Sequence, residues 1–90
     1  MLFMIIERFK DADPLPVYRH LRDHGRGLPE GLRYVDSWVE PSFQRCFQVM
    51  ECDDVSLLSR WIAQWHDLVE FEVVPVLTSE QAARIVTSSG

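Results

Sequence analysis

The sequence has no long hydrophobic stretch and little basic charge, and each shortage excludes a class of protein. Its longest uninterrupted apolar run is residues 1–6, far short of the roughly 20 residues that a membrane-spanning helix needs. That run has no basic start, so we expect no secretory signal peptide and a cytoplasmic location. The excess of 14 Asp and Glu over 9 Lys and Arg, a net charge of −5, argues against a nucleic-acid or membrane partner.

Cysteine is also scarce, and its spacing argues against a disulfide. Cys46 and Cys52 lie in one alternating segment. In a strand that rises about 3.3 Å per residue they are roughly 20 Å apart, whereas a disulfide requires Cα atoms within about 7 Å. We therefore expect two reduced thiols that behave as small buried hydrophobic side chains.

Several catalytic motifs are missing. The four glycines, at positions 25, 27, 31 and 90, form no phosphate-binding loop, and no serine has the flanking glycines of a nucleophile elbow. The turn-rich segment 26–31 suggests no chemistry. The sequence predicts no metal and no cofactor, and it leaves open whether the protein is an enzyme.

The residues that are present are typical of one small folded domain. Ninety residues with 47% hydrophobic content predict a single domain over 1–90. A chain of this size buries only about 60–65% of its unfolded surface. Self-association is one way to cover the remaining apolar surface.

Changes in hydrophobic periodicity divide the chain into alternating strands and helices. The expected elements are a strand over 1–8, a helix over 14–25, strands over 32–40 and 43–52, a helix over 55–68, a strand over 69–77 and a helix from Thr78 to about Val86, followed by a frayed tail over 87–90. Asp13, Asp54 and Thr78 are the expected helix caps. Pro75 lacks a backbone donor, so its strand lies at a sheet edge.

The order β-α-β-β-α-β plus a C-terminal helix predicts an α+β, ferredoxin-like fold. Right-handed crossovers give a four-stranded antiparallel sheet with the first and third strands in its centre and the helices on one face. The other face is bare, and a second copy of the chain is the simplest partner for it. A two-residue turn at 41–42 would set Asp36 opposite Phe47 and Trp38 opposite Arg45. A one-residue slip reverses the faces, so the sequence leaves open which side of this hairpin meets the helices.

Four segments carry a resemblance to a known family. They are residues 4–10, 32–40, 45–54 and 65–75, which span nearly the whole chain. They resemble a family of short bacterial proteins catalogued as domain of unknown function 3303. That family is similar to the dimeric α+β barrel group, in which two ferredoxin-like protomers pack sheet against sheet. The resemblance implies this fold and a homodimer through the sheet face, but it carries over no catalytic residue.

A cavity between sheet and helices is the expected ligand site. Its expected lining residues are Tyr18, His24, Trp38, Trp61 and Trp65. Such aromatic walls suit a small apolar or aromatic molecule. Fold analogy suggests chemistry of the cofactor-free oxygenase or isomerase type. The alternative is a non-enzymatic stress-related, ligand-sensing or interaction module, in which the tryptophans are simply core.

The histidines allow several interpretations. His20 and His24 lie one helical turn apart, a spacing that can chelate a metal, but no third ligand follows at a suitable spacing. A solvated pair and a histidine at the rim of a pocket are the other interpretations. His66 falls on the polar side of its helix, so we expect it to be exposed.

Polar residues interrupt the apolar strands. They are Glu7, Asp36, Gln48 and Glu51. A buried carboxylate needs a partner or a raised pKa. Arg33 and Arg45 are available for cross-strand ion pairs, and the alternative is that one carboxylate is the acid or base of a pocket.

Overall fold

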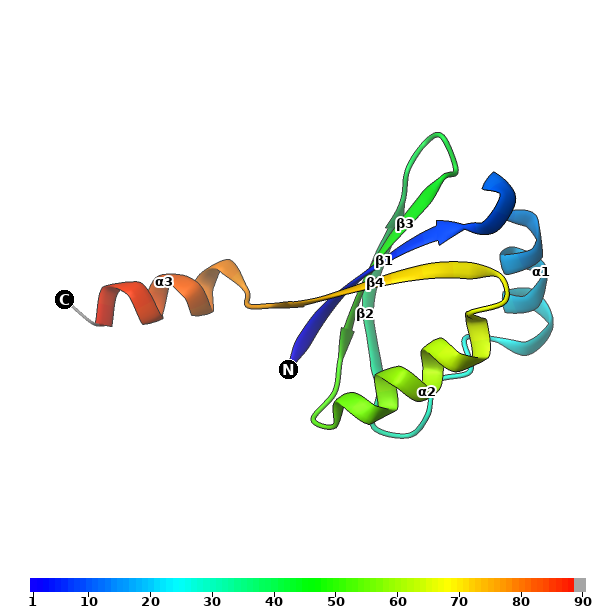
Figure 1. The fold of residues 1–90 in the computed structure, drawn as a ribbon. Coiled ribbons are helices and arrows are strands. Elements are labelled where there is room, and N and C mark those ends of the chain that lie inside the picture. The colour runs from blue at the N-terminus through cyan, green and yellow to red at the C-terminus, as the bar shows by residue number, and fades with distance from the viewer. Residues whose placement is uncertain (89–90) are drawn as a thin grey trace.

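The structure, a computed structural model, describes residues 1–88 and contains the expected elements in the expected order (Figure 1). Their bounds are β1 (Leu2–Phe9), a 3-10 turn (Lys10–Ala12), α1 (Leu15–His24), β2 (Arg33–Val39), β3 (Arg45–Glu51), α2 (Val55–Trp65), β4 (Val69–Val76) and α3 (Ser79–Ser88). The last helix therefore continues beyond Val86, and the rest of the expected tail, 89–90, lies outside the described residues.

The four strands form one antiparallel sheet in the order β2-β3-β1-β4. The central strands are β1 and β3, and β4, which contains Pro75, is an edge. The ferredoxin-like α+β fold is thus confirmed. The fold has this order because each helical crossover returns the chain to the sheet on the same side.

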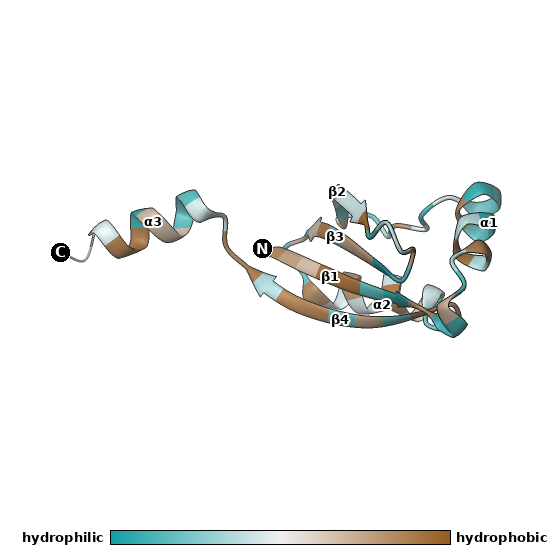
Figure 2. Cartoon of the chain, turned by 90° about the horizontal axis from the view of Figure 1, so that it is seen from above, coloured by the Kyte–Doolittle hydropathy of each residue, from teal (hydrophilic) through white to brown (hydrophobic). Residues whose placement is uncertain are grey.

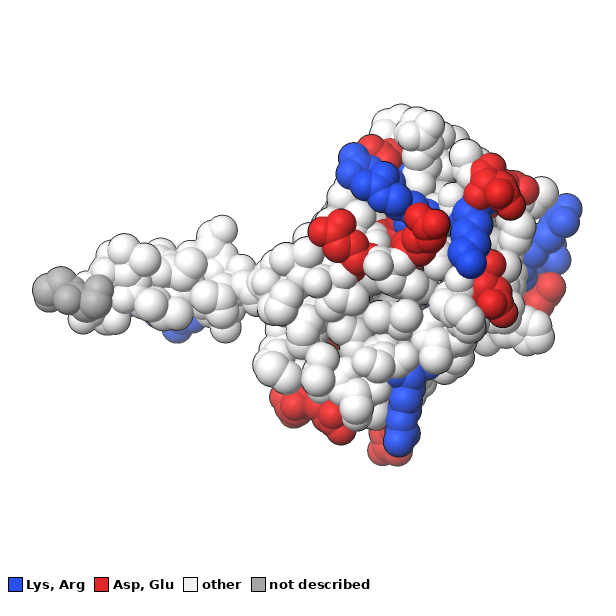
Figure 3. All heavy atoms as spheres, viewed as in Figure 1, with Lys and Arg blue, Asp and Glu red and all other residues white. Residues whose placement is uncertain are grey.

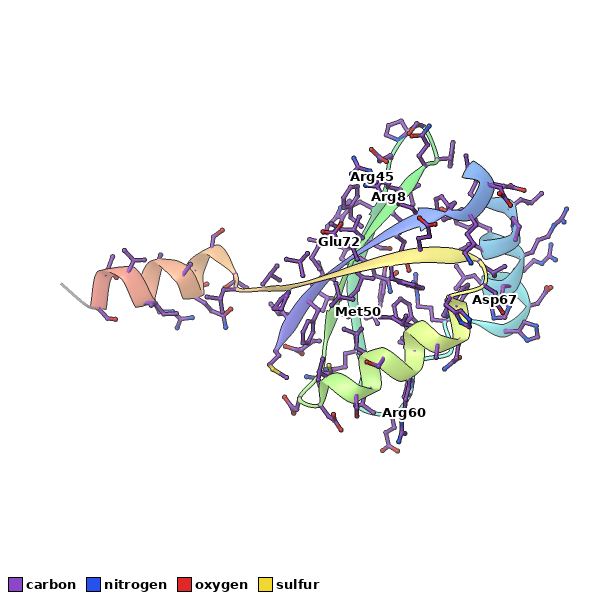
Figure 4. All side chains as sticks on the ribbon, viewed as in Figure 1. Arg8, Arg45, Met50, Arg60, Asp67 and Glu72 are labelled. Atoms are coloured by element: carbon purple, nitrogen blue, oxygen red, sulfur yellow. The ribbon has the colours of Figure 1, made fainter. Side chains whose placement is uncertain are left out.

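Side chains of the sheet alternate between a helix-covered face and an open face. In β1 the odd-numbered residues are buried and most even-numbered ones are half-buried. Phe3, Ile5 and Met50 pack with Leu58 and Trp61 of α2 in one buried cluster, and Met50 lies on the α2 side of the sheet (Figure 4). Figure 2 shows that β1 is hydrophobic over most of its length and becomes hydrophilic toward its C-terminal end.

The helix caps follow the sequence signals. The Asp13 carboxylate accepts a bond from the backbone N–H of Leu15 at 3.0 Å, and Asp54 accepts one from Ser56 at 2.9 Å. Thr78 and Gln81 form a reciprocal capping box, with bonds of 2.9 and 3.0 Å. Each cap satisfies donors that have no partner within the helix.

The β2–β3 hairpin differs from the expected register. Its turn is longer than two residues, so Asp36 lies opposite Val49 and Trp38 lies opposite Phe47. The expected pairing of Trp38 with Arg45 is therefore wrong by two residues. A shift of two keeps every side chain on its face, and Trp38 lies on the open face, 54% exposed.

The open face combines half-buried apolar side chains with charged groups. Its half-buried apolar residues are Leu2, Met4, Ile6, Phe47, Val49 and Val76. Arg8, Arg45 and Glu72 lie close together on it (Figure 4). Acidic and basic side chains are interspersed in this region of the surface (Figure 3).

Helix α3 projects away from the sheet as a continuation of β4 (Figures 1 and 2). None of its described residues is buried. The radius of gyration is 14.9 Å, against about 12 Å for a compact chain of this length. The projecting helix accounts for the excess, and Leu77 and Ile85 are each 59% exposed along this arm.

Both cysteines are free and buried. Within the described part of the chain, no helix is long and apolar enough to cross a membrane.

Candidate functional site

A small cavity lies between the sheet and the two helices that cover it. Its volume is about 80 Å³. The sheet contributes Glu7, Phe9, Ser37, Val39, Cys46 and Gln48, and the covering elements contribute Val17, Tyr18, Leu21, Arg26, Trp61 and Trp65. None of the residues of α1 is fully buried, so this helix covers the cavity loosely.

Three of the five expected lining residues border this cavity. They are Tyr18, Trp61 and Trp65. His24 does not line it and is exposed at the end of α1. The half-buried histidine is His20, whose ring meets the Trp65 ring edge-on with centroids 4.6 Å apart. On α1, His20 is therefore the histidine that packs against Trp65, and His24 is exposed to solvent.

Trp38 is also not a lining residue. It points to the open face of the sheet, where it lies opposite Phe47. The helix-covered side of β2 carries Ser37 and Val39 instead. Because side chains alternate along a strand, the β2–β3 register determines which face of the sheet each side chain of β2 occupies.

The tryptophans of α2 hold the loop that follows α1. The indole N–H groups of Trp61 and Trp65 both donate to the backbone carbonyl of Arg26, at 2.9 and 3.0 Å. The Gln64 side chain donates to the next carbonyl, that of Gly27, at 3.0 Å. Residues three and four apart share a helix face, so one side of α2 fixes this loop.

The fixed loop directs the Arg26 side chain to the cavity. Its guanidinium lies 3.8 Å above the centre of the Tyr34 ring and donates a 3.4 Å bond to Gln48 Oε1. The sequence had suggested no chemistry for segment 26–31. A single arginine between Gly25 and Gly27 has no periodic signal, and only the bonds to α2 reveal its position.

Glu7 is the buried carboxylate of the cavity. It is 8% exposed and lies opposite Cys46 in the β1–β3 register. Burial raises the pKa of the Glu7 carboxyl, and the Cys46 hydrogen bond and the charge of Arg26 offset this only in part. Polar strand residues could be members of cross-strand ion pairs or the acid or base of a pocket. Glu7 fits the second interpretation.

The other strand carboxylates fit the ion-pair interpretation or solvation. Glu51 pairs with Arg33 at 2.6 Å, and Arg45 pairs with Glu40 at 2.8 Å. Asp36 is exposed and accepts a bond from the backbone of Ser37. These groups lie away from the cavity, so Glu7 differs from them by its burial.

Cys46 and Tyr18 complete the polar side of the cavity. Burial, with the nearby Glu7, raises the pKa of the Cys46 thiol to about 12. Burial also raises the pKa of the Tyr18 hydroxyl, with contributions from Cys46 and Glu7. At neutral pH the thiol is therefore protonated and a weak nucleophile, and the cavity offers hydrogen-bonding groups beside one guanidinium.

The histidines form no metal site with other residues. The rings of His20 and His24 are 4.7 Å apart, but residues 1–88 contain no group of three or more His, Cys, Asp or Glu arranged to hold a metal ion. His66 is exposed, as expected, and contacts Asp67 at 3.2 Å.

Comparison with known proteins identifies the family of the chain. The family described as "Domain of unknown function (DUF3303)" matches residues 1–90, so the chain belongs to this family. No curated protein and no solved structure matches the chain. The family has no stated activity, so a function must come from the geometry of the site.

The loop contacts predict different outcomes for two glycines. Gly25 and Gly27 have φ values of +70° and +69°. A Cβ added at Gly27 would lie 2.4 Å from Gln64 Oε1, whereas a Cβ added at Gly25 would have no atom within 4 Å. Gly27→Ala should therefore lose the Gln64 bond, about 0.5–1.5 kcal/mol, in addition to backbone strain of about 1–3 kcal/mol. Urea unfolding measures the sum of these two losses in the free energy of unfolding.

A double-mutant cycle separates the two costs. In a Gln64→Ala background the cost of Gly27→Ala should fall by about 0.5–1.5 kcal/mol, and the cost of Gly25→Ala should not change. Equal costs of Gly27→Ala in both backgrounds would contradict the proposed fixing of the loop by α2.

The raised pKa of Glu7 predicts a pH-dependent stability difference. A folded-state pKa above the usual 4.5 means that the folded chain holds the proton more tightly, so this stabilisation is present below pH 4.5 and is lost as pH rises. Glu7→Gln cannot ionise. Its stability relative to wild type should increase as pH rises from 4.5 to 8, measured by urea unfolding. The control Glu30→Gln, at an exposed position, should give a flat difference. A flat difference for Glu7→Gln would contradict the raised pKa of the buried Glu7 carboxyl.

Proposed function

We propose that this member of the DUF3303 family binds a small molecule in the cavity between sheet and helices, and that Glu7 exchanges a proton with it. The function is then that of a cofactor-independent isomerase. The single observation that carries this proposal is the Glu7 carboxyl, buried on a central strand and lining a cavity. Burying an ionisable acid costs stability, so a buried acid that lines a cavity is a candidate for a functional group.

The surroundings of Glu7 support proton exchange. A raised pKa makes the carboxylate a stronger base than an exposed glutamate. The Arg26 guanidinium, fixed over the Tyr34 ring, stabilises negative charge that develops on a bound molecule. Phe9, Trp61 and Trp65 give the cavity apolar walls beside the reacting atoms.

The cavity volume limits the molecule. The volume of about 80 Å³ is several times the roughly 10–15 Å³ that a site needs to hold one water. It is less than the roughly 300–1,000 Å³ of typical drug-sized sites. We infer a ligand of only a few non-hydrogen atoms.

The proposed chemical step needs no further reactant. The Glu7 carboxylate removes a proton from a carbon next to a carbonyl group, and the electron pair of the C–H bond forms an enolate. The Glu7 carboxylic acid then returns the proton to the same carbon, or to the γ carbon where a C=C bond of the ligand is conjugated with the enolate. Atoms and electrons balance, since the proton leaves and re-enters through one carboxyl group.

Deuterium uptake tests this step. The chain is incubated in D₂O with 2-butanone, a neutral carbonyl compound of suitable size, and exchange next to the carbonyl is followed by NMR. Wild type should accelerate exchange over buffer. Glu7→Gln should lower the accelerated rate by about 10²–10⁴-fold, and Asp67→Asn should retain it.

A second measurement separates binding from catalysis. Titration of the ¹⁵N-labelled chain with 2-butanone should shift the amides of Tyr18 and Cys46 in a saturable way. Val17→Phe fills the cavity from α1 and should abolish this shift, whereas Leu15→Phe, at an exposed position of the same helix, should not. Binding without exchange would reject the isomerase and favour the ligand-sensing alternative, and equal exchange by Glu7→Gln would reject the role of Glu7.

We further propose that the chain forms a homodimer through its open sheet face. The support is that the face and the α3 arm both expose apolar side chains, and the arm projects away from its own sheet (Figure 1). In an isologous pair each copy covers both surfaces of the other. Arg8, Arg45 and Glu72, which lie close together on this face (Figure 4), would then place charges of both signs in the interface.

Light scattering tests the dimer. At tens of micromolar the mass should be twice the 10.5 kDa of one chain. Trp38→Glu, on the open face, should reduce it to one chain because a charge would be buried, whereas Val55→Glu, exposed on α2, should not. A wild-type mass of one chain would overturn the proposal.

The proposed location is the cytoplasm. Its support is the pair of free, buried cysteines, which suit a reducing compartment.

A further inference from the structure

Arg26 is a half-buried cation that has no carboxylate partner in the protein. Among residues 1–88, Arg22, Arg33, Arg45 and Arg84 each have an acidic group within ion-pair distance, and Arg26 has none. The charge of Arg26 acts on Glu7 and Cys46, but no oxygen of Glu7 lies within the 4.0 Å of an ion pair. The nitrogen atoms of the Arg26 guanidinium are therefore more than 4.0 Å from the Glu7 oxygens, and both groups line the cavity.

The position of this guanidinium is fixed from two sides. The backbone carbonyl of Arg26 accepts hydrogen bonds from the indole N–H groups of Trp61 and Trp65 on α2. Its planar head lies 3.8 Å from the centre of the Tyr34 ring, and one N–H reaches Gln48 at 3.4 Å. A stacked guanidinium keeps its remaining N–H groups in its own plane, available for a two-oxygen acceptor.

We propose that the ligand of the cavity is a small monocarboxylate, whose carboxylate pairs with Arg26 while Glu7 faces the rest of the ligand. This inference rests on the proposed function, since it names the chemical class that the same cavity binds. The carboxylate lies on the Arg26 side of the cavity, so Glu7 keeps its role as the base. The short apolar body lies against Phe9, Val17 and Trp65.

Glu7 makes this binding depend on pH. The groups that face it are Cys46 from β3, Tyr18 from α1 and Arg26 from the loop, while α2 contributes only the indole rings of Trp61 and Trp65 and β4 contributes Phe71. His20 lies behind the Trp65 ring. When Glu7 ionises, a second negative charge faces the ligand carboxylate. Affinity for the anion therefore falls as pH rises, and binding takes up a proton.

A pair of matched probes tests the charge. Butyrate and butyramide have the same size, and only butyrate is an anion. In NMR titrations of the ¹⁵N-labelled full chain at constant ionic strength, butyrate should bind at least about tenfold more tightly than butyramide, through one charge-assisted pair. Its affinity should fall between pH 5 and pH 8, and Glu7→Gln should remove this dependence.

Arginine variants locate the effect. Arg26→Gln should weaken butyrate at least about tenfold and leave butyramide unchanged. Arg60→Gln, on the exposed side of α2, is the matched control and should change neither. Arg26→Lys keeps the charge and should bind butyrate more tightly than Arg26→Gln, with circular dichroism confirming that each variant is folded.

The outcomes distinguish the two proposals. If butyrate and butyramide bind equally, or if Arg26→Gln and Arg60→Gln behave alike, the carboxylate assignment is overturned while ligand binding in the cavity stands. If neither probe nor 2-butanone shifts the cavity amides, the proposed function itself fails. The comparison of the two probes on wild type does not depend on any variant.

Discussion

The cavity depends on one convergence of hydrogen bonds, in which Trp61 and Trp65 of α2 both donate to the Arg26 carbonyl. This contact joins a segment without regular structure to the most buried helix of the domain. It sets the height of α1 above the sheet, because α1 leads directly into this loop. It also places a guanidinium beside the central strands. Buried indole N–H groups need acceptors. The packing of Trp61 and Trp65 in the core therefore also positions Arg26 at the cavity.

The two faces of the sheet have different roles for one reason. Alternation along β1 and β3 sends every second side chain toward α2, and those residues form the core near Ile5 and Met50 and the cavity near Glu7 and Cys46. The core half contains fully buried side chains such as Ile5 and Met50. The cavity half is covered by α1, which buries none of its residues fully. A polar site therefore exists where helix coverage is weakest, and the opposite face keeps its exposed apolar residues.

The sequence predicts the elements well and the site only in part. Periodicity and caps locate the strands and helices within a few residues, since those signals are local. Tyr18, Trp61 and Trp65 are found because large aromatic residues on apolar helix faces point inward. His24 and Trp38 are wrong as lining residues, because helix rotation and hairpin register are set by distant packing. Arg26 is missed because a loop residue has no periodicity, and the two interpretations of Glu7 are separated only by its burial.

By itself the sequence determines the family, the β-α-β-β-α-β order and the position of the helix caps, since each depends on residues that are close in the chain. Only the tertiary structure decides that Glu7, Tyr18, Arg26 and Cys46 meet around one small cavity. These residues come from two strands, a helix and a loop, and the distances between them depend on how α1 and α2 pack on the sheet. Long-range packing, rather than local preference, therefore brings together a carboxyl and a guanidinium that lie far apart in the sequence.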